Sequence, residues 1–363
     1  MDTISFARGV PAPECLPVEE LADCARAAIL SEGRTVLSYG TGSGYQPLRE
    51  WIAERHGVDP GRVLVTNGGL QGFVFLAQHL CATQPGCRVL VEQPTYDRPL
   101  KILHSLGADV VPLAMDDQGL DPAALERALT EGPKPALVYT IPTFQNPSGR
   151  TLSTERRQRI ADLVREHDVL MLEDDPYGLV RFEGEAPPSL FSFDTDRIAY
   201  ASSFSKTIAP GVRVGYFVLP LDLHAALEAI AVSTYISPVM LAEATVWEFI
   251  RRGNFEPNLE RVRGLLRARR DAMLEALEGE FGGSDATWSR PEGGYFVWLD
   301  VPGVESGDLL ERATAAGVTF VRGSDFGGGP TTLRLAFSFV SPDEIHDGVA
   351  RLAALVPAAA PAV

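Results

Sequence analysis

Seven short apolar runs recur along the chain, and most are separated by stretches with the 3.6-residue periodicity of helices. The runs cover residues 63–65, 89–91, 110–113, 136–139, 169–172, 198–201 and 216–219. Each is bounded by Gly, Pro or charged residues, as buried strands are. One intervening stretch, 154–167, places Ile160, Leu163 and Val164 on one face, after Ser153 as a helix-capping residue. This alternation predicts a largely parallel sheet with helices on both faces.

The last two runs are connected differently from the others. Only residues 202–215 join them, which is too short for a crossover helix, so we expect this pair to be antiparallel. Beyond residue 241 long helical stretches come first, followed by strand patterns at 293–299, 318–321 and 333–337 and a last helix at 342–355. This second pattern predicts a separate α+β unit.

The sequence therefore predicts an α/β protein with two domains. We expect residues 36–240 to form a large domain, in which helices flank a mixed, mostly parallel seven-stranded sheet. Residues 241–363 are expected to form a smaller α+β domain. Residues 1–35 are too few to fold alone, so we expect them to pack on the small domain or on a dimer partner.

Composition excludes several classes of partner. The 363 residues are 45% hydrophobic and carry a net charge of −16, with no basic cluster longer than 267–270, which argues against nucleic acid. No apolar run reaches the roughly 18 residues of a membrane span. The start lacks the features of an export signal, and the four cysteines show no C-x-x-C spacing, with Cys81 expected as a buried free thiol. A cytoplasmic protein is expected, and the scattered histidines predict no metal site.

The most informative segment is 201–216, which places one lysine among hydroxyl groups directly after a predicted strand. At a strand end Lys206 can leave water, which disfavours its ammonium form, and a neutral amine condenses with aldehydes. Ser203, Ser205 and Arg213 could hold a phosphate beside it. A lysine of this kind next to a phosphate site indicates pyridoxal 5′-phosphate. The alternative is an exposed lysine in a serine-rich loop.

Other strand ends carry compatible groups. Gly69 and Leu70 open a helix, where backbone N–H groups favour an anion, although such turns are often only turns. Tyr96 could stack on a flat heteroaromatic ligand or could cap the core. Asn146, held extended by Pro147, could donate to a phenolate oxygen or could belong to a simple turn.

Charged residues at two further strand ends need partners. Glu173, Asp174 and Asp175 are costly beside a buried strand unless a cation is near, and a protonated pyridine nitrogen would be one. A short turn would bring Tyr177 to the same ring as Asp174; a solvated acidic loop or a metal site is the alternative. Arg334 interrupts an apolar strand, and its fork matches a substrate carboxylate or an internal acid equally well.

In this order the motifs resemble the fold type I pyridoxal-phosphate enzymes of the class I aminotransferase group. The chain is most similar to the branch that holds 2-aminoadipate and kynurenine aminotransferases and the aminotransferase-like domains of MocR-type regulators. The resemblance runs from residues 4–11 to the last helix. It implies transfer of an amino group between an L-amino acid (large aliphatic, aromatic or 2-aminoadipate-like) and a 2-oxo acid.

The resemblance also implies a role for each matching residue. Lys206 would form the Schiff base, Asp174 would contact the pyridine nitrogen and Tyr96 would stack on the ring. The implied cofactor ligands also include Gly69, Leu70, Asn146, Tyr177, Ser203, Ser205 and Arg213. Tyr39 would reach the phosphate of the neighbouring subunit, which implies a homodimer with shared active sites. The implied substrate-binding residues are Gly9, Val10, Asn146 and Arg334.

Some residues depart from the family pattern or leave the reaction open. Gly69 and Leu70 stand where Ser-Gln is common, so two side-chain contacts to the phosphate are missing. Arg8 and Arg322 replace Gly and Pro, and would either bias the pocket toward acidic substrates or face solvent. Phe144 and Tyr96 favour aromatic or large aliphatic substrates.

The same motifs fit other functions less completely. Another pyridoxal-phosphate reaction, such as decarboxylation, elimination or oxidation of an amino acid, would use the same scaffold. A ligand-sensing regulatory module would need a basic winged-helix domain, for which the family's first motif, beginning at Ile4, leaves no room.

Overall fold

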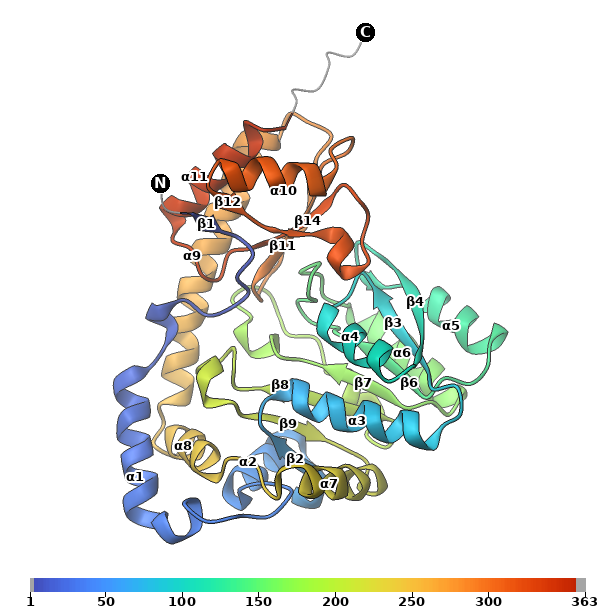
Figure 1. The fold of residues 1–363 in the computed structure, drawn as a ribbon, viewed down its shortest axis with the longest axis vertical. Coiled ribbons are helices and arrows are strands. Elements are labelled where there is room, and N and C mark those ends of the chain that lie inside the picture. The colour runs from blue at the N-terminus through green and yellow to red at the C-terminus, as the bar shows by residue number, and fades with distance from the viewer. Residues whose placement is uncertain (1–2, 357–363) are drawn as a thin grey trace.

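The computed structural model describes residues 3–356, and its larger sheet has eight strands in the order β2-β9-β8-β7-β6-β3-β4-β5 (Figure 1). The strands are β2 (Val63–Thr66), β3 (Arg88–Gln93), β4 (Asp109–Asp116), β5 (Gly119–Leu120), β6 (Leu137–Thr140), β7 (Met171–Asp174), β8 (Ile198–Ser203) and β9 (Gly215–Val218). All seven predicted strands are present, and the two-residue β5 adds an edge strand. As predicted, β3, β4, β6, β7 and β8 are parallel and β9 runs antiparallel to β8.

Helices cover both faces of this sheet. They are α2 (Gln46–His56), α3 (Gly69–Thr83), α4 (Asp97–Ser105), α5 (Pro122–Glu131), α6 (Thr154–Glu166), α7 (Leu221–Tyr235) and α8 (Met240–Arg251). Because successive side chains of a strand point to opposite faces, Leu137 and Tyr139 enter the core under α3, α4 and α7. Val138 enters the core under α2, α5, α6 and α8. Burial on both faces explains why the strands are apolar runs rather than alternating patterns.

The second sheet is antiparallel and has its own core. Its strands are β10 (Thr287–Trp288), β11 (Phe296–Asp300), β14 (Thr332–Ala336) and β13 (Val321–Arg322), in that spatial order. α10 (Ser306–Ala315) and α11 (Pro342–Ala353) contribute to the same core. The long helix α9 (Phe255–Phe281) joins the two units, since Phe255 packs in the first core and Val262 in the second (Figure 1).

The N-terminal segment contacts two parts of the molecule. β1 (Ile4–Ser5) pairs in parallel with β12 (Val318–Thr319), which brings residues 7–9 to the edge of the second sheet. α1 (Val18–Val36) packs against α8 through the core that contains Cys24. The division into residues 1–35, 36–240 and 241–363 stays a prediction.

Three expectations from the sequence concern cysteine pairing, membrane spans and metal sites. The expectation of a free thiol at Cys81 is wrong: a turn after α3 returns the chain, and Cys81 and Cys87 form a disulfide with a Cα–Cα distance of 4.8 Å. Within residues 3–356 no helix has both the length and the apolarity that crossing a membrane requires. The same residues contain no group of three or more His, Cys, Asp or Glu side chains suited to a metal ion. The cytoplasmic location stays a prediction.

Candidate active site

A cavity of about 700 Å³ opens between the two sheets at the carboxyl ends of β6, β7 and β8. Its lining includes most of the predicted site residues: Gly9, Gly69, Leu70, Tyr96, Asn146, Asp174, Tyr177, Ser203, Ser205, Lys206, Arg213 and Arg334. The predicted residues Tyr39 and Val10 lie outside this lining. Open α/β sheets bind ligands at this end of their strands, so the location fits a ligand site.

Lys206 follows β8, lines the cavity and reaches the N-terminal segment. Its Nζ donates to the Gly9 carbonyl oxygen at 2.7 Å. The same atom lies 5.0 Å from the centre of the Tyr295 ring and 5.7 Å from that of Tyr177. Burial, and secondly the charge of Arg334, lower the pKa of Lys206 to about 8. The amine is therefore far more often neutral at pH 7 than an exposed lysine.

An anion cradle lies beside Lys206. Arg213 has a left-handed backbone (φ 50°), and its guanidinium lies so close to Gly68 that a Cβ there would overlap it. Gly69 begins α3, where the first N–H groups have no acceptors within the helix. The Ser203 hydroxyl donates to the Ser205 hydroxyl at 2.8 Å. Backbone N–H groups at a helix start, two hydroxyls and one guanidinium together suit a phosphate.

Alternation along β7 places the two carboxylates at its end, Glu173 and Asp174, on opposite faces of the sheet. Glu173 points to the α6 face, where it pairs with the fully buried Arg157 at 3.4 Å. Burial raises the pKa of Glu173 to about 6, while Arg157 opposes that rise. Asp174 points to the opposite face and lines the cavity.

Asp174 has one side-chain donor among the described residues. The Tyr139 hydroxyl donates to its Oδ2 at 2.7 Å. Burial raises the pKa of Asp174 to about 7, and the neighbouring carboxylates Asp175 and Glu92 add to that rise. A cation in the cavity would restore the ionised form, which a protonated ring nitrogen would do.

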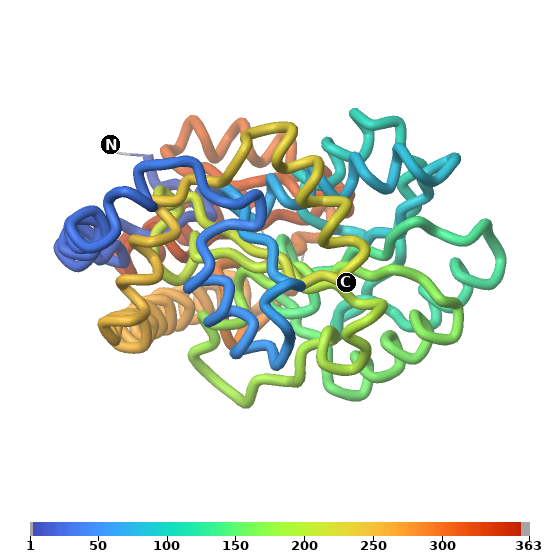
Figure 2. Tube along the Cα trace, turned by 90° about the horizontal axis from the view of Figure 1, so that it is seen from below, coloured from blue at the N-terminus to red at the C-terminus, as the bar shows by residue number. Residues whose placement is uncertain are grey.

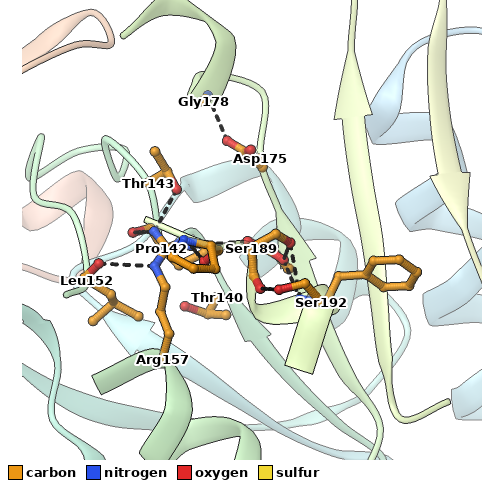
Figure 3. A network of polar contacts seen from close by, with 12 residues as sticks. Thr140, Pro142, Thr143, Leu152, Arg157, Asp175, Gly178, Ser189 and Ser192 are labelled. Carbon is orange, nitrogen blue, oxygen red and sulfur yellow. Dashed lines mark hydrogen bonds and ion pairs between the residues drawn. The ribbon is translucent and has the colours of Figure 1, made fainter. Parts of the chain in front are cut away.

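Arg157 also holds the loop that carries Asn146 (Figure 3). Its Nη2 donates to the Pro142 carbonyl and to Thr143 Oγ1, both at 2.8 Å. Its Nε donates to the Leu152 carbonyl at 3.0 Å. One buried guanidinium therefore ties both ends of this loop to α6.

Arg334 reaches the cavity from β14. Its guanidinium carbon lies 4.3 Å from the centre of the Phe296 ring and 4.9 Å from that of Phe326. It donates to Asn146 Oδ1 and to the Ala7 carbonyl, each at 2.9 Å, and its buried Nε has no partner. Burial lowers its pKa to about 10. No carboxylate of the described residues lies within ion-pair distance of Arg334, so the internal ion pair considered from the sequence does not form among them.

Two aromatic residues flank the same space. Tyr96 precedes α4, and the adjacent Thr95 N–H donates to the Phe326 carbonyl at 3.1 Å, which ties this loop to the second unit. Burial raises the pKa of Tyr96, and Asp174 adds to the rise. Tyr177 is buried and packs edge-on against Phe296, with ring centres 5.8 Å apart.

These residues fit pyridoxal 5′-phosphate on structural grounds. The cavity offers an amine on Lys206 whose lowered pKa makes the neutral form accessible near pH 7, hydroxyl, amide and guanidinium groups beside it that suit a phosphate, and the carboxylate of Asp174. The unpartnered Nε of Arg334 indicates an anionic ligand.

Of three further residues considered from the sequence, Phe144 does not line the cavity, and Arg8 and Arg322 take one of the two positions that the sequence left open, away from it. Phe144 is buried under Arg181, with the guanidinium carbon 4.6 Å from its ring centre, because its own positive φ (48°) turns the loop inward. Arg8 stacks on Phe339 and Arg322 pairs with Asp325, so neither arginine lines the cavity.

The remaining differences concern Val10 and three residues that sequence reasoning missed. Val10 is exposed and its carbonyl accepts from Ser338. Phe296 and Phe326, which hold Arg334, come from the second unit, and no sequence pattern placed them at the cavity. The third residue is Tyr139. The sequence contained one signal for it, because it is a residue with a polar group at the end of the predicted strand 136–139.

Comparisons with known proteins agree with this geometry. The family model for aminotransferase class I and II matches residues 4–352. Aromatic-amino-acid aminotransferase 1 of Thermococcus litoralis is 35% identical over 97% of this chain and 87% of its own. 2-Aminoadipate transaminase of Thermus thermophilus is 36% identical over 96% of this chain and 89% of its own.

A solved structure extends the agreement to the fold. The kynurenine aminotransferase of Pyrococcus horikoshii, in complex with PMP, superimposes with a TM-score of 0.93 at 34% identity, covering 98% of this chain and 91% of that one. Sequence and fold thus agree along nearly the whole chain. The protein belongs to the class I and II aminotransferases and is a pyridoxal-phosphate-dependent enzyme.

Proposed function

We propose that this aminotransferase acts on L-amino acids with large aliphatic, aromatic or 2-aminoadipate-like side chains, with a 2-oxo acid as acceptor. One observation carries the proposal: Arg334, which has no carboxylate partner within residues 3–356, lies between two phenyl rings in the cavity that also holds Lys206. A guanidinium held in this way suits an α-carboxylate, which it can bind with two parallel hydrogen bonds.

The other residues that line the cavity support the proposed range of substrate side chains. Phe73, Phe296 and Phe326 line it, which favours large apolar substrates. Arg98 and Lys101 also line it; they share the single carboxylate of Asp97, and the remaining positive charge would attract a second carboxylate, as in 2-aminoadipate. Relatives named for aromatic, 2-aminoadipate and kynurenine substrates add support.

The cofactor and the chain divide the chemistry between them. When bound, pyridoxal phosphate supplies an aldehyde that holds the substrate amine and a ring that accepts electrons from Cα. Gly69, Leu70, Ser203, Ser205 and Arg213 would hold its phosphate.

The other residues would orient the reaction and move the proton. Arg334 would hold the substrate carboxylate and thereby fix the direction of the Cα–H bond. The amine of Lys206, with a pKa near 8, would take the proton from Cα as general base. Asp174 would keep the ring nitrogen protonated. Tyr96 would stack on the ring, and Tyr177 and the Asn146 amide, whose oxygen is occupied by Arg334, would donate to its phenolic oxygen.

Two measurements test this function. Borohydride reduction of the loaded enzyme followed by peptide mass spectrometry should place the pyridoxyl group on Lys206. Transamination of leucine, phenylalanine, kynurenine and 2-aminoadipate with 2-oxoglutarate should be faster than that of alanine. Reduction at another lysine, or a preference for alanine, would contradict the proposal.

The alternative reactions on this scaffold are separated by their products. A single-turnover reaction with an amino acid should yield pyridoxamine phosphate and 2-oxo acid in equal amounts. Release of carbon dioxide, ammonia or hydrogen peroxide in place of that pair would instead identify decarboxylation, elimination or oxidation.

We also propose that two copies of the chain form a homodimer with shared sites. Exposed apolar side chains gather on the end of α1, the following loop and α7: Leu30, Leu37, Tyr39, Val232 and Ile236. The loop lies against α7 and α8, since Gly42 approaches Val232 and Gly40 approaches Met240. Figure 2 views the molecule from this end. Tyr39 is 78% exposed, which suits a residue that completes the partner's site.

Mixed dimers test the sharing of sites. Tyr39→Ala and Lys206→Ala should each inactivate the enzyme. After the two variants are unfolded and refolded together, half of the sites in a mixed dimer carry both residues intact, so activity should return. A monomeric mass in light scattering, or no recovery on mixing, would contradict the dimer.

A further inference from the structure

We propose that Tyr139 is a positioning residue for Asp174, fixing the direction of that carboxylate and favouring its ionised form. The inference rests on the proposed function, which places Asp174 at the ring nitrogen of the cofactor, and it adds the group behind that carboxylate. Tyr139 does not line the cavity, so it would act only through Asp174.

The two carboxylates at this turn are supported to different extents. Asp175 accepts from the Gly178 N–H at 2.7 Å and from the Tyr200 hydroxyl at 3.0 Å. Among the described residues, Asp174 has a single side-chain hydrogen bond, from Tyr139 at 2.7 Å. Asp174 is also the one of the two that lines the cavity. Its orientation therefore depends on Tyr139 more than that of Asp175 depends on Tyr200.

The sheet fixes the geometry of this hydrogen bond. Tyr139 pairs with Leu172 across β6 and β7, and Asp174 lies two residues further along β7. Both side chains therefore point to the same face. Tyr139 is fully buried, and Phe73 packs edge-on against it with ring centres 5.3 Å apart. A fully buried ring packed against Phe73 cannot turn its hydroxyl elsewhere without disturbing the core.

The hydrogen bond from Tyr139 favours the ionised form of Asp174. Burial, Asp175 and Glu92 all raise the pKa of Asp174, whereas the hydrogen bond from Tyr139 lowers it. Burial raises the pKa of Tyr139 well above its ordinary value, so its hydroxyl remains a donor at every working pH. A hydrogen bond to a charged group is worth more than one between neutral groups.

Tyr139→Phe tests the proposal, and Tyr200→Phe is the matched control. Each variant removes one buried tyrosine–carboxylate hydrogen bond, but only the first touches Asp174. Three quantities are measured: the Kd of the apo protein for pyridoxal phosphate, the nitrogen-15 chemical shift of the bound ring nitrogen against pH, and kcat and KM. We expect Tyr139→Phe to weaken cofactor binding about tenfold.

Tyr139→Phe should also lower the pH at which the ring nitrogen loses its proton by about one unit, for the same loss of interaction. It should reduce kcat with little change in KM. Tyr200→Phe should stay within about twofold of the wild type in all three quantities, whatever stability it loses.

Asp174→Asn separates failure of this inference from failure of the proposed function. If Asp174→Asn matches the wild type, the role of Asp174 is wrong and the inference falls with it. If Asp174→Asn is impaired and Tyr139→Phe is not, the function stands and the inference is overturned. In the Asp174→Asn background, Tyr139→Phe should have no further effect on Kd or on the nitrogen shift. A full tenfold loss there would show that Tyr139 acts on the fold rather than through Asp174.

Discussion

The lowered pKa of Lys206 predicts how the apo protein captures its cofactor. Burial is the first cause of the shift from 10.5 to about 8, and the charge of Arg334 is the second. At pH 7 the neutral fraction of the amine then rises from about 1 in 3000 to about 1 in 10. Since only the neutral amine attacks an aldehyde, the reactive fraction of Lys206 at pH 7 should be about 300-fold larger than that of an exposed lysine.

Stopped-flow mixing of apo protein with pyridoxal phosphate between pH 6 and 10 measures this. The rate of covalent capture should rise about tenfold per pH unit below pH 8 and level off above it. Arg334→Met should move the midpoint upward, because it removes a cation, but not to 10.5, because burial remains. Lys134→Ala, at an exposed lysine paired with Asp168, serves as the control and should leave the profile unchanged.

One result would refute the reasoning. If the wild-type rate keeps rising tenfold per unit beyond pH 9.5, Lys206 titrates like an exposed lysine and the cavity does not desolvate it. An unchanged midpoint in Arg334→Met would refute the smaller, electrostatic contribution alone.

Three further predictions concern stability, each measured by urea denaturation of the apo protein. Burial raises the pKa of Glu243 from 4.5 to about 8, so the folded state keeps a proton that the unfolded state releases, and stability falls as pH rises through that window. Glu243→Gln should flatten this slope by up to about 1.4 kcal/mol per pH unit, and equal slopes would contradict it. Gly72→Ala, whose Cβ would overlap Phe217, should cost about 1–3 kcal/mol, whereas Gly264→Ala in open space should stabilise by up to about 1 kcal/mol. Arg157→Met should cost about 3–5 kcal/mol and weaken cofactor binding, because the Asn146 loop loses its anchor.

Much of the fold could be predicted because each strand is a short apolar run with helical periodicity on either side. The antiparallel pair β8 and β9 followed from a connection too short for a helix, and the structure confirms it. The strand ends then placed Asp174 and Lys206 at one edge, since parallel strands bring their carboxyl ends together.

The features that could not be predicted from the sequence depend on contacts between distant parts of the chain or on local backbone geometry. Phe296 reaches Arg334 because β11 pairs with β14 in the second sheet, and Phe326 reaches it from the turn at residues 323–326; no local pattern records these contacts. Phe144 was misassigned because a positive φ, which a non-glycine residue rarely adopts, turns its ring into the core. Cys81 and Cys87 meet through a turn whose geometry their spacing does not reveal.

The end of β7 shows why the local sequence indicated the site residues but not the residues that hold them in place. Consecutive residues of a strand face opposite sides, so Glu173 must find its partner under α6 while Asp174 must find one under α3. The sequence shows two adjacent acids and the need for partners, but the partners, Arg157 and Tyr139, come from elements fixed only by the order of strands in the sheet. Because of this alternation, Glu173 stabilises the fold on one face of the sheet, and Asp174 faces the cofactor cavity on the other. Substitutions at Glu173 and Asp174 should therefore separate, the first lowering stability and the second lowering cofactor affinity.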